Sequence, residues 1–240
     1  MIYKYFPKEN YEDFSSGRVI YHKSNYPNYP VRLAGEIFHR CLEYSKKKNK
    51  LCLYDPCCGS AYLLTILGYL FNELIETIYC SDISNEAVEL SYKNLSLLSY
   101  KGIEKRKHEL NDYIKIYNKE SHRNALNSLE RIEKLIKHEI KNNVFAADVL
   151  IKKELINKNF FADIVITDVP YGNLVNWINN NGEERENVLN GIIPIIKSDT
   201  IIAISHNKSQ KITSSEFNTV EEIHIGHRKI KILKLKAASG

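Results

Sequence analysis

The sequence predicts one α/β domain over residues 1–240, built on a mostly parallel, doubly wound sheet of seven strands. Two observations predict it. Short apolar runs that end in Asp or Ser alternate with helix-patterned segments, as in parallel strands joined by crossover helices. Two β-rich runs at 219–225 and 229–235 are split by a short connection that contains Gly226 and His227, and we expect them to close the sheet as an antiparallel hairpin.

The first 30 residues are rich in tyrosine and proline and show no sustained period, so we expect an N-terminal arm over 1–30 that packs on the domain. After it, the patterns alternate along the chain. The expected helices are 31–42, 62–74, 84–99 and 183–196. The expected strands before the final pair are 51–55, 77–81, 144–147, 161–167 and 200–205. Ser84 has the side chain and position of a helix N-cap.

Residues 101–141 are almost wholly helical in pattern. Ordinary connections between strands and helices are about 2–6 residues long, so this stretch predicts an inserted helical pair. It carries 11 Lys and Arg against 7 Asp and Glu. The excess positive charge is suited to RNA phosphates, although such a face can also be merely solvated.

Composition narrows the class of protein. The chain is 43% hydrophobic and 26% charged, which gives enough apolar content for a core and excludes a disordered chain. No apolar run approaches the ~18 residues of a membrane span, and the first residues lack a secretory apolar core. The five cysteines show neither a Cys-x-x-Cys pair nor a zinc spacing. We therefore expect a cytoplasmic protein with no metal and no membrane partner. The sequence leaves the oligomeric state open, and we favour a monomer.

Four acids follow the expected strands. Asp55, Asp82, Asp148 and Asp168 stand where an open α/β sheet binds its ligand, beyond the carboxyl ends of the strands. The turn 55–60 contains Gly59, which allows a ligand to approach the backbone closely. Asp82 is placed to accept hydrogen bonds from ribose hydroxyls. The pattern therefore predicts a cofactor that contains a nucleoside.

The cofactor class follows from what the turn lacks. The Gly-x-Gly-x-x-Gly fingerprint and the phosphate-binding Gly-Lys-Ser/Thr are both missing, which disfavours NAD and ATP. S-adenosylmethionine carries ribose without phosphates, and the arrangement resembles the Rossmann-like class I methyltransferases. We assign the cofactor to Asp55, Pro56, Cys57, Cys58, Gly59, Ser60, Asp82, Ile83, Asp148, Val149 and Asp168. Asp148 can equally be a helix cap, and the two cysteines are more typical of small turn residues than of reactive thiols.

The segment Asp168-Val169-Pro170-Tyr171 follows a strand and is similar to the (Asp/Asn)-Pro-Pro-Tyr motif of enzymes that methylate amino nitrogens of bases. Such a nitrogen is a poor nucleophile because its lone pair is delocalised into the ring. The resemblance implies that the Asp168 side chain and the Pro170 carbonyl hold the amino hydrogens while Tyr171 stacks on the base. Val169 replaces the first proline of the motif.

Three further segments, 18–24, 26–38 and 55–65, together with the helical insertion, resemble the AviRa family of avilamycin-resistance methyltransferases. The resemblance spans residues 17–175. It implies methyl transfer to N2 of a guanine in 23S rRNA, and antibiotic resistance. Ala61 stands where such enzymes usually place another glycine.

We expect RNA contact from basic residues of the arm, the first helix and the insertion: Arg18, His22, Lys23, Arg32, Lys105, Arg106 and Lys107. Arg32 could instead meet the methionine carboxylate. Three alternatives remain open. An amino-methyltransferase can act on another RNA or DNA, or on a protein glutamine, and a non-catalytic RNA-binding module can retain the fold.

Overall fold

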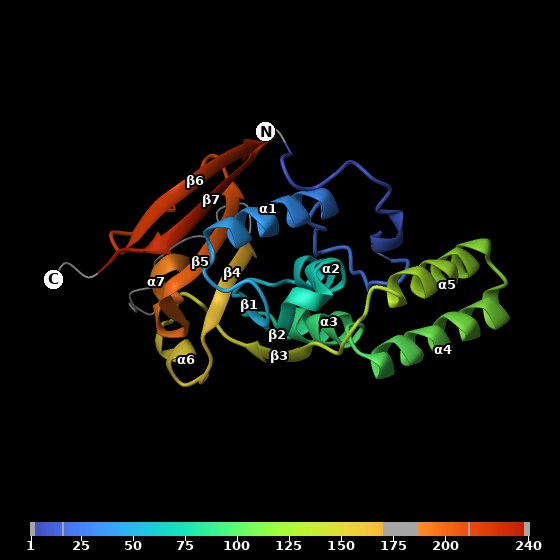
Figure 1. Ribbon diagram of the computed structural model, residues 1–240. Coiled ribbons are helices and arrows are strands. Elements are labelled where there is room, and N and C mark those ends of the chain that lie inside the picture. Colours follow the sequence, from blue (N-terminus) through green and yellow to red (C-terminus); the bar gives the residue numbers. More distant parts are fainter. Residues whose placement is uncertain (1–2, 16, 170–186, 211, 238–240) are drawn as a thin grey trace.

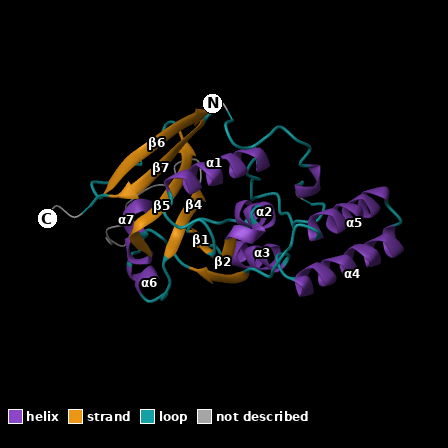
Figure 2. Ribbon diagram, viewed as in Figure 1, coloured by secondary structure: helices purple, strands orange, loops and turns teal. Residues whose placement is uncertain are grey.

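The computed structural model describes residues 3–15, 17–169, 187–210 and 212–237, and it forms a sheet between two layers of helices (Figures 1 and 2). The sheet has seven strands in the order β3-β2-β1-β4-β5-β7-β6. Strands β1 to β5 run parallel, and β7 runs antiparallel to both β5 and β6. The strands are β1 Leu51–Asp55, β2 Ile75–Asp82, β3 Lys141–Ala146, β4 Ala162–Asp168, β5 Ile196–Asn207, β6 Phe217–Ile225 and β7 Arg228–Leu235. This sheet confirms the predicted fold class.

The helices cover the two faces of the sheet unequally. The larger core lies under the longer helices α1 Val31–Tyr44, α2 Tyr62–Leu70 and α3 Asn85–Ser96, and the smaller one under the short helices α6 Lys153–Ile156 and α7 Val188–Gly191. Side chains of β1 alternate between them, with Leu51 and Leu53 in the first core and Tyr54 in the second. Burial on both faces explains why the strands read as continuous apolar runs.

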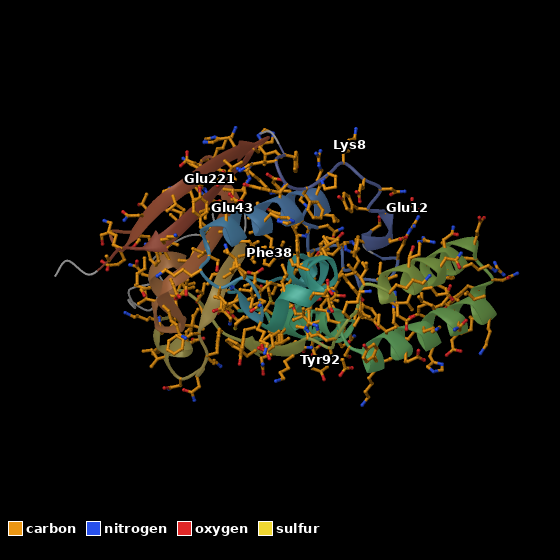
Figure 3. All side chains as sticks on the ribbon, in the orientation of Figure 1. Lys8, Glu12, Phe38, Glu43, Tyr92 and Glu221 are labelled. Carbon is orange, nitrogen blue, oxygen red and sulfur yellow. The ribbon has the colours of Figure 1, made fainter. Side chains whose placement is uncertain are left out.

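Helix α1 joins the arm to the sheet. Its Phe38 is fully buried, and Figure 3 shows this side chain between α1 and the body of the domain. The buried carboxylate of Glu36 accepts hydrogen bonds from the backbone amides of residues 4–6, at 2.8–3.0 Å. Arg40 pairs with both Glu36 and Glu221 of β6. Glu36 and Arg40 of α1 therefore connect the arm to the final hairpin.

The predicted helix over 183–196 is shorter in the structure. Residues 183–186 lie outside the described part of the chain, and α7 ends at Gly191. A single 3-10 turn over Ile193–Ile195 then contains Pro194, and β5 starts directly after it. Proline has no amide hydrogen and clashes with the preceding helical turn, so α7 cannot continue through it.

The helical insertion lies between α3 and β3. It consists of α4 Tyr100–Tyr117 and α5 Glu120–Glu133, which project from the body on the side away from β6 and β7 (Figure 1). Strand β3 begins three residues before the predicted run 144–147, so the helices occupy less of the chain than the predicted 101–141.

Arg106 of α4 fastens the insertion to the arm. Its side chain is 7% exposed and donates hydrogen bonds to the carbonyl oxygens of Val19 and Arg18, each at 3.0 Å. It also pairs with Glu109 at 3.0 Å and lies over the ring of Tyr21, 4.3 Å from the ring centre. A buried guanidinium with this set of partners fixes two segments that are distant in sequence.

Replacing Arg106 should therefore destabilise the fold. Arg106→Met leaves the two backbone carbonyls without their donor and Glu109 without its cation, at a cost of roughly 2–4 kcal/mol of unfolding free energy. Lys105→Met, at the exposed neighbouring position, is the matched control and should change stability by less than about 0.5 kcal/mol. Urea unfolding of both variants checks this, and equal effects would contradict the structural role of Arg106.

Candidate active site

Three carboxylates gather where parallel strands end. Asp55, Asp82 and Asp168 are the last residues of β1, β2 and β4, and Asp148 follows β3 by two residues. The strand order reverses between β1 and β4, since the chain passes from β1 to β2 and β3 on one side and to β4 and β5 on the other. This is the position at which open α/β sheets bind ligands. The structure thus brings the sequence-predicted acids to one edge of the sheet.

The turn after β1 is held by its own backbone. The Cys58 amide donates to the carbonyl of Ser81 at 3.0 Å, and the Gly59 amide donates to Oδ2 of Asp82 at 2.9 Å. Gly59 has φ 54° and Ala61 has φ 53°, both in the left-handed region. Ala61 thus adopts the conformation for which a glycine is preferred, and it does so while fully buried.

A tyrosine of the arm covers this turn. A Cβ atom added at Gly59 would lie 3.3 Å from the ring of Tyr26, so the ring packs close to the glycine. The Tyr26 hydroxyl lies 3.5 Å from that of Ser84, at the start of α3. The tyrosine-rich composition of the arm predicts packing on the domain and does not show which tyrosine meets this turn. Because Tyr26 lies close to Gly59, the arm forms part of the wall of the candidate site.

Asp82 and Ile83 present two different surfaces. Asp82 accepts a second hydrogen bond, from the Ser84 amide to Oδ1 at 3.0 Å, so its carboxylate is fixed in orientation. Ile83 is 66% exposed, which is unusual for a large apolar side chain. An acid beside an exposed aliphatic side chain can hold a polar sugar and a flat apolar ring. The N-cap role of Ser84 is confirmed, since its hydroxyl accepts from the Ala87 amide.

The segment after β3 packs closely against a glycine of α7, Gly191. Asp148 accepts the Leu150 amide at 2.9 Å, and its own amide donates to Glu154 at 2.8 Å. Val149 is buried, and a Cβ at Gly191 would lie 1.8 Å from its carbonyl oxygen. Gly191 of α7 is therefore a positioning residue that sequence reasoning missed.

Asp168 has a cationic neighbour. Its Oδ2 lies 3.5 Å from Nη2 of Arg228, the first residue of β7, and the Val169 amide donates to the Ser205 carbonyl at 2.8 Å. The predicted site residues Pro170 and Tyr171 lie outside the described residues. Arg228 was not predicted as a site residue, although its place next to the hairpin dipeptide Gly226-His227 could have located it at this edge.

Asp55 is the most buried of these acids. Its Oδ1 accepts the Cys57 amide at 3.0 Å, so it shapes the turn from within. Burial raises the pKa of the Asp55 carboxyl to about 7, and the negative charges of Asp82 and Asp168 act in the same direction. The three carboxylates are therefore close enough to interact.

Comparisons with known proteins agree with this geometry. Residues 1–228 match the family model described as rRNA methyltransferase AviRa. A 23S rRNA (guanine(2535)-N(1))-methyltransferase from Streptomyces viridochromogenes is 30% identical, over 92% of this chain and 91% of the relative. The chain belongs to the AviRa family of rRNA methyltransferases.

Solved structures give the same relationship. The AviRa rRNA methyltransferase from Streptomyces viridochromogenes superposes with a TM-score of 0.86 at 28% identity, over 98% of this chain and 96% of that one. TrmN from Thermus thermophilus shares the fold, with a TM-score of 0.52 at 11% identity, over 89% of this chain and 51% of that one. S-adenosylmethionine is the methyl donor that the AviRa family and fold imply, as the sequence predicted.

The basic residues assigned to RNA have different surroundings in this AviRa-family structure. Arg18 lies 3.3 Å from Glu12, Lys23 pairs with Glu86, and Arg32 donates to the Phe6 carbonyl at 3.1 Å. His22 and Lys105 are exposed, and Lys107 is half-buried.

The expectation for Arg106 needs correction. Its guanidinium is buried against the backbone of the arm and does not face a phosphate. A pattern of consecutive basic residues on a helix cannot show which of them points inward, so the sequence placed it with its exposed neighbours.

Asp55 predicts a specific pH dependence of stability. An unfolded Asp titrates near pH 4, so the raised pKa means that the folded state binds the proton more tightly than the unfolded state. Asp55 therefore favours the folded state fully below about pH 4, and this contribution is lost as the pH rises through about 7. Asp55→Asn keeps an acceptor for the Cys57 amide and cannot ionise.

The melting temperature of the Asn variant, relative to wild type, should thus rise by roughly 5 °C or more between pH 4 and pH 8. Asp112→Asn, on the exposed face of α4, should follow wild type at both values. A constant difference between Asp55→Asn and wild type across this range would show that Asp55 is ionised normally.

Proposed function

We propose that this chain transfers a methyl group from S-adenosylmethionine to a guanine base of 23S rRNA. The observation that carries the proposal is the position of Asp168, at the end of β4 and next to the strand-order reversal that holds the cofactor turn. The relative named above acts on a guanine of 23S rRNA, which supports the same substrate. Such a substrate implies action in the cytoplasm.

The site residues fit the cofactor. The Asp82 carboxylate can accept hydrogen bonds from ribose hydroxyls, since each of its oxygens is used by one amide and has further acceptor capacity. Exposed Ile83 offers an apolar surface to one face of adenine, and the segment 148–149 lies at the end of the neighbouring strand β3. In the turn 55–60, Gly59 is in the left-handed conformation and has no side chain. The backbone of this turn can therefore contact the methionine part of S-adenosylmethionine.

The transfer needs a nitrogen with an available electron pair. The cofactor supplies a methyl group on a sulfonium, so that a C–N bond forms at guanine, the C–S bond breaks with its electron pair left on sulfur, and the nitrogen loses one proton. The Asp168 carboxylate accepts a hydrogen bond from that nitrogen and is the acceptor placed for its proton. Holding the nitrogen in line with the methyl group supplies the remaining part of the barrier reduction.

The acceptor atom is either N1 or N2, which are adjacent on the same edge of guanine. The Asp-x-Pro-Tyr motif led us to expect N2, whereas the relative is named for N1. We propose N1. A carboxylate that accepts from N1–H on this edge also lies beside the N2 amino group, so Asp168 serves either outcome.

Mapping the product tests the proposal. The protein is incubated with tritiated S-adenosylmethionine and separate pools of 23S rRNA, 16S rRNA, tRNA, DNA and protein, and labelled RNA is digested to nucleosides. We expect label in 23S rRNA as 1-methylguanosine. Label as N2-methylguanosine would keep the substrate and move the acceptor by one atom. Label only in tRNA, DNA or protein would support an alternative enzyme, and no label in any pool would support a binding module.

Variants of Asp168 test whether the protein is an enzyme or a binding module that has retained the fold. Asp168→Ala should lower single-turnover methyl transfer on the order of 10²–10⁴-fold, because the carboxylate acts mainly in the transition state. Asp168→Asn should retain more activity, since an amide oxygen still accepts a hydrogen bond. Rapid-quench assays give the rates, and calorimetry should show a much smaller loss in S-adenosylmethionine binding. Wild-type rates in the alanine variant would overturn the role of Asp168.

Exposed charge on α4 should strengthen RNA binding through phosphates. Reversing Lys105 and Lys107 to Glu, with Arg106 left intact, should weaken binding to every RNA sequence and lower the salt slope by ~0.7 per lost contact on single-stranded RNA. Lys46 and Lys50 are exposed between α1 and β1, at the amino-terminal end of β1 and away from the carboxyl ends of the strands. Replacing both with Glu gives a control variant with the same charge change. Filter binding over a salt series measures both, and equal slopes in all three proteins would make the α4 face merely solvated.

A further inference from the structure

Arg228 lies at the candidate active site because of the topology of the final hairpin. Strand β7 runs antiparallel to β5, so its first residue lies beside the last residue of β5, and Arg228 pairs in register with Asn207. The two-residue turn at Gly226 and His227, with Gly226 at φ 53°, sets the register of β7 on β6, where Arg228 lies opposite Ile225. The topology thus places a guanidinium beside the carboxyl ends of parallel strands, next to the Asp168 carboxylate.

The guanidinium is held on two sides. Nη2 of Arg228 lies 3.5 Å from Oδ2 of Asp168, and the side chains are 24% and 21% exposed. The group also lies over the ring of Tyr29, 5.2 Å from the ring centre, and this ring is buried in the arm. Arg228 is therefore oriented by the protein while part of its surface stays accessible.

A pocket of ≈ 580 Å³ lies beside Arg228. Arg228 lines it together with Pro30, Leu33, Asn207 and Gly226, among others. Its size is in the usual range for a small-molecule site, and its walls are largely apolar with few polar groups. A base taken out of an RNA strand needs a space of this kind, and Arg228 connects this pocket to Asp168 at the end of β4.

We propose that Arg228 and Asp168 together read the edge of the target guanine, with Arg228 donating to O6 and Asp168 accepting from N1–H. This inference rests on the proposed function and names the residue that selects guanine. The pair offers a donor next to an acceptor, and guanine presents the acceptor O6 next to the donor N1–H. Adenine presents the reverse order, an amino donor next to the acceptor N1, so it meets donor against donor and acceptor against acceptor.

The same contact supports the chemistry. When N1 loses its proton and bonds to the methyl carbon, negative charge moves onto O6 in the transition state. A cation fixed at O6 stabilises that charge without reorganising. Arg228 thus contributes to binding and to rate, whereas a purely structural ion pair would contribute to neither. Because the pair is partly exposed, its loss should cost little stability.

The first test compares Arg228→Met with Lys229→Met. Lys229 is the next residue of β7, points to the opposite face of the sheet and pairs with Glu222 at 2.9 Å, so it is a matched charge-loss control. On 23S rRNA, Arg228→Met should lower kcat/KM by about 10- to 100-fold, the usual value of an Arg–guanine contact, while S-adenosylmethionine affinity and melting temperature stay near wild type. Lys229→Met should stay within about twofold of wild type.

A cycle that combines the protein variants with a modified target base separates loss of base recognition from a folding defect. The mapped guanine is replaced by 6-thioguanosine, whose sulfur accepts hydrogen bonds poorly, in a synthetic RNA. The wild-type enzyme should lose activity on this RNA, and Arg228→Met should lose at least about fivefold less, because the contact is already absent. Lys229→Met should respond as wild type does. Arg228→Lys, which keeps the charge, should restore part of the loss.

Each outcome assigns failure to one claim. If the wild-type protein methylates no guanine of 23S rRNA, the proposed function fails. If the wild type is active and Arg228→Met matches it, or if both show the same loss on 6-thioguanosine, the reading of O6 by Arg228 fails and the proposed function stands.

Discussion

The hydrogen bond from the Gly59 amide to the Asp82 carboxylate ties the turn after β1 to the end of β2, and the site is arranged around it. Gly59 must hold a left-handed conformation to make it, and Ala61 adopts the same conformation two residues later. The buried Asp55 carboxyl supports the turn from inside by accepting the Cys57 amide. Desolvation of that carboxyl is the energetic cost of this arrangement.

The elements expected to meet RNA are connected to the same turn. Asn94 of α3 donates to the Ser60 carbonyl at 2.8 Å and exchanges two hydrogen bonds with the backbone of Tyr21. The Tyr21 hydroxyl donates to Glu109 of α4 at 2.8 Å. A continuous set of buried and half-buried hydrogen bonds thus runs from the insertion through the arm to the cofactor turn.

The sequence predicts this architecture well because local patterns decide it. Strand ends at Asp55, Asp82 and Asp168 are visible as acids after apolar runs, and strand and helix periods locate the elements between them. Arg228 and Arg106 could not be assigned, because their roles depend on pairings between segments that are distant along the chain. Arg228 reaches the site only through the antiparallel register of β7, and Arg106 turns inward only because the arm packs there.

A crystal structure of this protein with S-adenosylhomocysteine would show whether Asp82 both shapes the turn and holds the cofactor. We predict ribose hydroxyls within hydrogen-bond distance of the Asp82 carboxylate, adenine against Ile83, and the amino-acid end at the turn 55–60. A ligand bound elsewhere, or a ribose that makes no contact with Asp82, would contradict the account.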